Sequence, residues 1–356
     1  MAIVALAAGI YVWHFQPDLV LNLGKPQQTP TPTELSSAAH LAMGDDYFSQ
    51  GKVDEALAEY QRAAELDPSN ATAYARWGRL LALRGRYSEA VNVAQRAVEI
   101  DAENPENQAI LGIVLDWAGR YDEAMRACLR ATELDRTYAL GYACLAEVYA
   151  DKGEWQRAQE TAEYAVQLDE NDFYVRRNLA YVLERQGKYN QAIDEYERAV
   201  ALQPNLSFLY VSLGRNWRIL GDYEMASEQF RKASEVDPRD PIPLDSLGLV
   251  YFDQGDYDMA AAQFERAIQV APDYGHAYGH LGWCHYVRRR YEEAIPQFEK
   301  AISLGAISIE YYYELGLSYA YTDQCEKAIP WFEAALELDP NSQPALQGLD
   351  YCRGRL

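Results

Sequence analysis

A period of 34 residues runs through most of this 356-residue chain and constrains its fold more than any other feature. Counted from Ser37 as position 1, nine units follow one another without an insertion or a deletion and end at Ser342. Positions 20 and 27 are alanine in all nine units, and position 8 is glycine in seven and alanine in two. Repetition at this length is typical of arrays in which each unit is one supersecondary structure that stacks on the next.

The pattern inside each unit predicts two helices. Apolar residues recur at i, i+3, i+4 and i+7 around the small ones, so the two helix backbones can pack closely together and onto the next unit. Position 15, between the helices, is glycine in seven units, as a left-handed helix end favours. Arg289 and Asp323 stand there in units eight and nine, so we expect the last two turns to be built differently. Proline at position 32, as in Pro68 and Pro340, stops the second helix.

On these residues the sequence resembles the tetratricopeptide repeat (TPR) family from Ser37 to Ser342. The family's aromatic residues are present at position 11 in five units and at position 24 in six. Units two to four depart from the pattern, because position 24 there is Ala94, Cys128 and Ala162. We therefore expect the packing of these three units to be tighter or locally grooved.

The resemblance implies an all-α fold, a right-handed superhelical solenoid of antiparallel helix pairs whose concave face is lined by the first helix of each unit. Residues 37–342 form the nine TPR repeats in this interpretation. Residues 343–356 restart the pattern but place Asp350 and Arg353 where a following unit requires glycine and an aromatic residue. We expect this last segment to be a C-terminal capping helix that faces solvent.

Composition argues against two classes of partner. The formal net charge is −22, so the field of the whole molecule repels nucleic acid and anionic membrane surfaces. The five cysteines are odd in number and form no CxxC pair, which indicates neither a zinc ribbon nor a disulfide scaffold. We expect buried or idle thiols. The alternative is a bridge between Cys128 and Cys144, which lie on successive predicted helices.

The first 36 residues do not follow the repeat. Residues 2–15 are uncharged and mostly apolar, but about 21 Å of helix is shorter than the ~30 Å of a hydrocarbon core. Tyr11, Trp13 and His14 resemble an interfacial aromatic belt, so we interpret residues 1–23 as the distal end of an N-terminal, single-pass transmembrane anchor that can begin upstream of Met1.

Two alternatives for this segment are a secretory signal, which should carry Lys or Arg before the apolar run, and a buried helix. Residues 24–36 are rich in Pro and Thr and predict a semi-extended linker. Only Lys25 is basic between the anchor and Gly51, which weakly favours an extracytoplasmic location for the repeats.

No catalytic motif is found in the sequence. There is no Gly-rich phosphate loop, Ser/His/Asp constellation or nucleophile elbow, so we predict that the protein is not an enzyme. Two functions of the TPR family are also disfavoured. The asparagine ladder of sugar-transferase arrays is absent at position 6, and no unit has the Lys at position 5 and Asn at position 9 that begin the carboxylate clamp for chaperone tails.

One spacing suggests a metal site. His276, His280 and Cys284 lie at i, i+4 and i+8 on one predicted helix, and histidines at i and i+4 can share zinc or nickel. The third residue is a full turn beyond the usual pair and no fourth ligand is evident. We therefore predict no metal and no cofactor.

The charge distribution points to a binding surface in the middle of the array. Units five and six carry 10 basic and 10 acidic residues, whereas units seven to nine carry 6 and 16. In TPR arrays, positions 2, 5, 9, 12 and 13 of the first helix face inward, and here they supply arginine and aromatic residues, which binding surfaces favour. The predicted groove residues are Arg177, Tyr181, Arg185, Phe208, Arg215, Arg218, Phe252, Trp283, Tyr286, Tyr313 and Tyr321.

An alternative interpretation is that these arginines only pair with neighbouring acids and that the tyrosines reflect a tyrosine-rich chain. The groove interpretation predicts a non-enzymatic scaffold or assembly factor that binds a partner protein, or an acidic or C-terminal-carboxylate peptide, at a membrane. The alternative function is that of a permanent structural subunit in a larger membrane-associated complex or oligomer.

Overall fold

The computed structural model describes residues 35–355, which contain nineteen helices, α3 to α21. The first helices of the nine units are α3 (Ser37–Ser49), α5 (Ala71–Leu83), α7 (Pro105–Trp117), α9 (Ala139–Asp151), α11 (Phe173–Arg185), α13 (Ser207–Ile219), α15 (Pro241–Asp253), α17 (Gly275–Val287) and α19 (Ile309–Tyr321). The second helices are α4 (Val53–Leu66), α6 (Tyr87–Ile100), α8 (Tyr121–Leu134), α10 (Trp155–Leu168), α12 (Tyr189–Leu202), α14 (Tyr223–Val236), α16 (Tyr257–Val270), α18 (Tyr291–Ser303) and α20 (Cys325–Leu338).

The helices begin where the repeat predicts. Every first helix occupies positions 1 to 13 of its unit, and every second helix begins at position 17. The alanines at positions 20 and 27 are fully buried in all nine units. The two helices of each unit pack against one another as an antiparallel pair. The prediction of an all-α array of helix pairs is therefore confirmed.

The turn within each unit ends the first helix in the left-handed conformation. The glycines at position 15 have φ between 73° and 80°. Arg289 and Asp323 adopt φ of 59° and 58° at the same position, so the prediction that the last two turns differ is wrong. The turn keeps its closing hydrogen bond, because the backbone N–H of Arg290 donates to the carbonyl of His285 (2.9 Å), as Arg86 does to Leu81 in unit two. This bond helps to hold a non-glycine residue in a conformation that costs ~1–2 kcal/mol.

Position 24 determines how closely consecutive first helices approach. In units two, three and four, where the residue is small, α5, α7, α9 and α11 pack directly on one another. In the other units, an aromatic ring fills this place and consecutive first helices have much less contact. The ring lies beneath the glycine at position 8, so that a Cβ added at Gly248 would lie 2.5 Å from Phe264. The expectation of tighter packing in units two to four is confirmed.

Four of the five cysteines form disulfides, so the prediction of buried or idle thiols is wrong for them. Cys128 bonds to Cys144, as the alternative proposed, and Cys325 bonds to Cys352. The spacing argument failed because stacked units bring residues from different helices together, with Cα atoms 5.7 Å and 5.1 Å apart. Cys284 remains a free, buried thiol, and burial raises its pKa to about 12.

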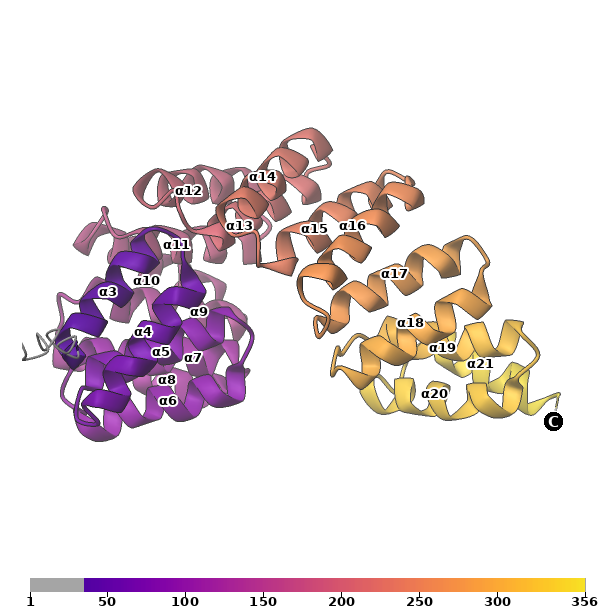
Figure 1. Cartoon of the computed structure of the whole chain (residues 1–356), viewed down its shortest axis with the longest axis horizontal. Helices are drawn as coiled ribbons and strands as arrows, with labels where there is room; N and C mark the ends of the chain where they lie inside the picture. The colour runs from indigo at the N-terminus through magenta and orange to yellow at the C-terminus, as the bar shows by residue number, and fades with distance from the viewer. Residues whose placement is uncertain (1–34, 356) are drawn as a thin grey trace, which may run out of the picture. The chain divides into compact units, whose positions relative to one another are not determined.

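Strong curvature brings units one and two back onto units five and six (Figure 1). The side chain of Asn205 donates to the carbonyl of Ser49 (3.0 Å). Arg84 donates to Asp54 (2.8 Å) and to the buried Asp237 (2.7 Å). We call α3 to α14, which are linked in this way, the closed turn.

Further contacts across the closure are apolar and ionic. The rings of Phe48 and Phe173 lie 6.4 Å apart, and the guanidinium of Arg79 lies 4.6 Å from the ring centre of the buried Tyr174. Arg239 also pairs with Glu55 (2.5 Å). The resemblance to TPR arrays predicted a long concave groove, whereas here these contacts join the two ends of the closed turn across it.

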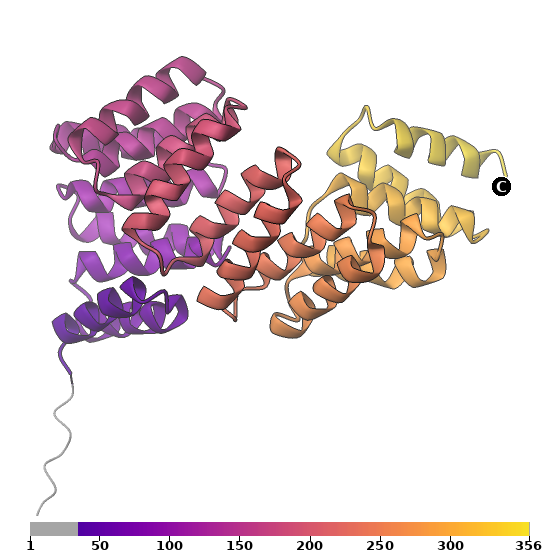
Figure 2. The ribbon, with the colours of Figure 1, turned by 90° about the horizontal axis from the view of Figure 1, so that it is seen from above.

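Units seven to nine, helices α15 to α20, continue away from the closed turn, and we call them the open units (Figure 2). The final helix α21 (Gln343–Arg353) packs on α20 and α19 with Ala345, Leu349 and Cys352 buried. Within residues 35–355, no helix is long and apolar enough to cross a membrane. The predicted anchor, residues 1–23, and most of the linker lie outside the described residues.

Candidate functional site

A pocket of about 570 Å³ lies inside the closed turn, where side chains from units two to seven converge. We call it the hub pocket. Its lining residues are Ala82, Leu83, Tyr87, Asp116, Trp117, Gly119, Tyr121, Glu147, Asp151, Arg177, Tyr181, Arg185, Phe208, Val211, Ser212, Arg215, Asp240 and Ile242. Its volume lies within the ~300–1,000 Å³ of ordinary ligand sites.

Five of the predicted groove residues line this pocket: Arg177, Tyr181, Arg185, Phe208 and Arg215. They come from α11 and α13, whose inward positions face the inside of the turn. Arg218, on α13, is not among the lining residues and instead donates to Asp253 of the next unit (2.6 Å). The remaining predicted residues lie on the open units.

One wall of the pocket is a buried network around Arg177. Its guanidinium pairs with Glu147 at 2.5 Å, and the indole N–H of Trp117 donates to the same carboxylate at 3.0 Å. The guanidinium also lies over the rings of Trp117 and Tyr181, at 5.5 Å and 5.1 Å from their centres. Arg177 therefore already has a carboxylate partner in this chain.

A second carboxylate, Asp151, extends this wall. The hydroxyl of Tyr181 donates to Asp151 at 2.5 Å, and Arg185 approaches the same carboxylate at 3.4 Å. The side chain of Arg185 is 45% exposed, so this pair is partly open to solvent. Burial and the bond to Asp151 raise the pKa of the Tyr181 phenol.

Asp116 is the most unusual residue of the pocket. It is only 3% exposed, no N–H or hydroxyl group of the described residues donates to its oxygens, and Asp151 lies close enough to accept a hydrogen bond from its protonated form. Burial, the charge of Glu147 and the neighbouring Asp151 raise the pKa of Asp116 to about 9. At neutral pH the carboxyl group is therefore protonated and uncharged.

Arg215, on α13, also lines the pocket and differs from the other pocket arginines. Its side chain is exposed, and it makes no ion pair or hydrogen bond within residues 35–355. Since Arg177 and Arg185 are paired with carboxylates, Arg215 is the pocket arginine that has no ion-pair partner among the described residues. A guanidinium in this situation can bind a carboxylate through two parallel N–H···O bonds.

Sequence reasoning missed Asp116, Trp117, Glu147 and Asp151. These residues occupy positions 12, 13, 9 and 13 of units three and four, which are inward positions like those of the arginines. The positional signal was therefore present. The charge balance alone did not indicate these residues, because it singled out units five and six, where basic and acidic residues are equal in number.

The other predicted residues form an aromatic face on the open units. Phe252 and Trp283 have ring centres 6.1 Å apart, and Tyr286 contacts the ring of Tyr291, which in turn lies 4.7 Å from Tyr321. Tyr313 is partly buried against the core of units eight and nine. None of these residues lines the hub pocket, so the predicted groove is divided between two places.

The histidine pair belongs to the interior of units seven to nine. His280 is hydrogen-bonded through Nδ1 to Asp245 (2.7 Å), and His276 lies 3.4 Å from the hydroxyl of Tyr311. Cys284 is buried in a separate cluster with Phe264. No group of three His, Cys, Asp or Glu side chains in the described part of the chain is arranged to hold a metal ion.

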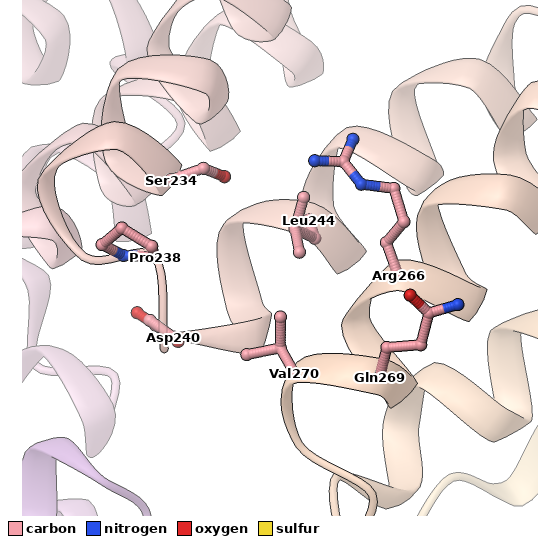
Figure 3. Close-up of a pocket in the computed structure, with 7 residues that line it drawn as sticks. All are labelled: Ser234, Pro238, Asp240, Leu244, Arg266, Gln269 and Val270. Atoms are coloured by element: carbon pink, nitrogen blue, oxygen red, sulfur yellow. The ribbon is translucent and has the colours of Figure 1, made fainter.

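A smaller pocket of about 240 Å³ lies between the second helices α14 and α16 (Figure 3). Ser234 and Arg266 lie on opposite sides of this pocket. Asp240 lines both this pocket and the hub pocket. The guanidinium of Arg266 is already bonded to Gln263 (2.8 Å). Nothing in the sequence analysis indicated this pocket.

Family comparisons agree with the repeat architecture. Models described as tetratricopeptide repeat or TPR repeat match residues 44–82, 81–148, 145–207, 214–255, 246–308 and 309–342. The chain therefore belongs to the tetratricopeptide repeat family. As a member of this family, it is a non-enzymatic protein-interaction scaffold. No curated protein sequence is recognisably similar to the chain.

The solved structures that share the fold include the following two. A crystal structure of the APC/C hetero-tetramer Cut9-Hcn1 has a TM-score of 0.60 at 16% identity, covering 89% of this chain and 76% of that one. A human IFIT1 dimer with PPP-AAAA has a TM-score of 0.58 at 18% identity, covering 85% and 91%. At these identities the likeness concerns the fold alone.

Proposed function

We propose that this tetratricopeptide repeat protein is an assembly scaffold that holds an acidic or C-terminal carboxylate end of a partner protein in the hub pocket, close to a membrane. The observation that carries the proposal is Arg215, an exposed guanidinium on a concave pocket that has no carboxylate partner in the described chain. Arg185 adds a second, partly exposed positive charge on the same lining.

The remaining lining suits the end of an extended peptide. Phe208, Val211 and Ile242 supply apolar surface beside Arg215, while the side chains of Ser212 and Asp240 are polar. The pocket thus combines apolar patches with many polar and charged groups, which can fix the orientation of a bound peptide end. A terminal carboxylate fits better than a continuous acidic segment, because Arg177 and Arg218 already pair with Glu147 and Asp253.

Peptide binding tests the proposal. A fluorescent decapeptide library with degenerate internal positions is presented to the full chain in detergent, once with free and once with amidated C-termini. We expect the free carboxylates to bind at least about tenfold more tightly, as a charge-assisted bond of ~1.5–3 kcal/mol implies. Salt should weaken this binding, since part of the attraction is screened.

Arg215→Glu provides the matching variant, and Arg231→Glu is its control. Arg231 is exposed on α14 of the same unit and does not line the pocket. Arg215→Glu should remove the preference for free C-termini without changing the melting temperature, whereas Arg231→Glu should keep it. Equal binding of free and amidated peptides by the unaltered protein would contradict the proposed recognition of a C-terminal carboxylate.

The membrane location rests on the sequence of residues 1–23, and the two disulfides support an extracytoplasmic side, because disulfides persist in oxidising compartments. In cell fractionation with alkaline carbonate washing, the full chain should remain in the membrane pellet and residues 37–356 should stay in the supernatant. Release of the full chain by carbonate would exclude the anchor.

A further inference from the structure

The acidic wall of the hub pocket lacks one positive charge. Asp116 on α7 and Glu147 and Asp151 on α9 contribute three carboxyl groups, whereas only Arg177 and Arg185 on α11 stand opposite them. Asp116 and Glu147 are 3% and 2% exposed. Both oxygens of Asp116 and one oxygen of Glu147 are buried and receive no hydrogen bond from an N–H or hydroxyl group of the described residues, and protonated Asp116 can only share its proton with Asp151. Buried acceptors of this kind are costly unless a donor reaches them.

We propose that an ammonium or guanidinium group of the bound segment occupies this acidic wall, so that the pocket recognises a chain end with a basic last residue, Lys or Arg, beside its free carboxylate. The proposal rests on the function proposed above and adds the identity of the terminal side chain. Its two recognition elements lie on different helices: Asp116 on α7 for the cation and Arg215 on α13 for the carboxylate.

The geometry suits a long cationic side chain. Trp117 and Tyr181 already hold the guanidinium of Arg177 over their faces, and aromatic faces attract cations. The ammonium of lysine has three donors for the three carboxyl oxygens of Asp116 and Glu147 that receive none, and because these oxygens have almost no exposed surface, side chains of the wall must shift when it binds. A neutral apolar side chain would leave these oxygens buried and unpaired.

In the empty pocket a proton supplies the missing charge, because burial, Glu147 and Asp151 raise the pKa of Asp116 to about 9. A bound cation stabilises the ionised carboxylate, so binding should release a proton. The charged and titratable groups that take part are Glu147 and Asp151 on α9 and Arg177, Tyr181 and Arg185 on α11, with Arg215 on α13 also lining the pocket. Affinity for the cationic end should therefore increase between pH 6 and pH 8.5, by up to about tenfold per pH unit.

The test uses four fluorescent decapeptides with one shared sequence that differ only at the end: lysine or norleucine, each with a free carboxylate or an amide. Anisotropy with the full chain in detergent should rank the free lysine peptide first. Norleucine in its place should weaken binding at least about tenfold, and Asp116→Asn should abolish this difference while keeping the preference for a free carboxylate. Asn has nearly the shape of the protonated Asp116, so the variant should melt at the wild-type temperature or above it at pH 7.

The outcomes separate the two proposals. Equal binding of the two free peptides, with both tighter than their amides, overturns the cationic subsite and leaves the proposed function standing. Equal binding of the free and the amidated lysine peptide, with both tighter than the norleucine peptides, overturns the proposed function and retains the acidic subsite. Calorimetry in two buffers of different ionisation enthalpy should show proton release for lysine and none for norleucine; no release with lysine contradicts the subsite. Free L-lysine that competes as well as the peptide would show a small-molecule site instead of a chain-end site.

Discussion

Units one to six and units seven to nine are built from the same 34-residue repeat, yet the first curl into a closed turn and the second remain open. Units two to four, in the middle of the closed turn, differ from units seven to nine in the residue at position 24. It is Ala94, Cys128 and Ala162 in units two to four, where first helices pack directly on each other, and an aromatic ring in units seven to nine, where they have little contact.

The comparison teaches that curvature in this array depends on one side chain per unit. A ring beneath the first helix holds the next unit's first helix away, whereas a small residue lets it approach. Three tight junctions in succession suffice to bring unit one onto units five and six. The hub pocket exists because of this closure, since its lining comes from helices as far apart in sequence as α5 and α15.

The largest expected effect comes from removing a ring in the open units. Phe264 is fully buried beneath Gly248 and against His280. Phe264→Ala should lower the free energy of unfolding by ~3–5 kcal/mol. The removed ring leaves a cavity, because the neighbouring first helices are spaced to fit the ring. Urea denaturation followed by circular dichroism measures this loss.

The reciprocal change, Ala162→Phe, places a ring in a tight junction of the closed turn. Overpacking there should cost ~1–3 kcal/mol and should also raise the radius of gyration in X-ray scattering, because unit four can no longer curve. If Ala162→Phe leaves the scattering curve unchanged, or Phe264→Ala costs less than ~1 kcal/mol, position 24 does not set the curvature.

A change at the closure itself should have an intermediate effect. Gly51 has positive φ, and a Cβ at this residue would lie 1.9 Å from the backbone oxygen of Asn205 in unit five. Gly51→Ala should therefore separate unit one from units five and six in addition to straining its own turn, with a total loss of ~2–4 kcal/mol of unfolding free energy. Hydrogen exchange in α3 and α4 should increase.

Gly255→Ala is the matched control, because Gly255 has the same turn conformation with nothing within 4 Å of the added Cβ. It should cost only the ~1–2 kcal/mol of the left-handed conformation. Equal losses for the two variants would mean that the contact between units one and five adds no stability.

The smallest expected effect is a gain. Arg289 occupies the left-handed turn of unit eight at φ 59°, so Arg289→Gly should raise the free energy of unfolding by up to about 1 kcal/mol. The opposite substitution at the same position of unit seven, Gly255→Arg, should lower the free energy of unfolding by ~1–2 kcal/mol. Differential scanning calorimetry of the two variants measures both shifts, and a destabilised Arg289→Gly protein would refute the assignment of strain.

The helix boundaries were predictable because each unit repeats the same local signals, and tight packing in units two to four followed from the missing rings at position 24. The closure was not predictable. It results from small rotations added over five units, and its ion pairs join residues 153 and 184 positions apart in sequence.

The candidate site shows the same division. The inward positions identified Arg177, Tyr181, Arg185, Phe208 and Arg215, all of which line the hub pocket. The pairing of Arg177 with Glu147 and the burial of Asp116 depend on how unit three lies against units four and five, which the pattern within one unit does not contain.

The disulfide between Cys325 and Cys352 has a consequence for how the molecule unravels. A linear stack ordinarily frays from its ends, because a terminal unit has one neighbour instead of two. Here a disulfide bonds α21 to the start of α20, and at the other end of the array unit one contacts units five and six. Under protease or mechanical force, the segment between α15 and α18 should therefore unfold first. Reduction of the disulfide between Cys325 and Cys352 should make the C-terminal helix α21 the first segment to unfold.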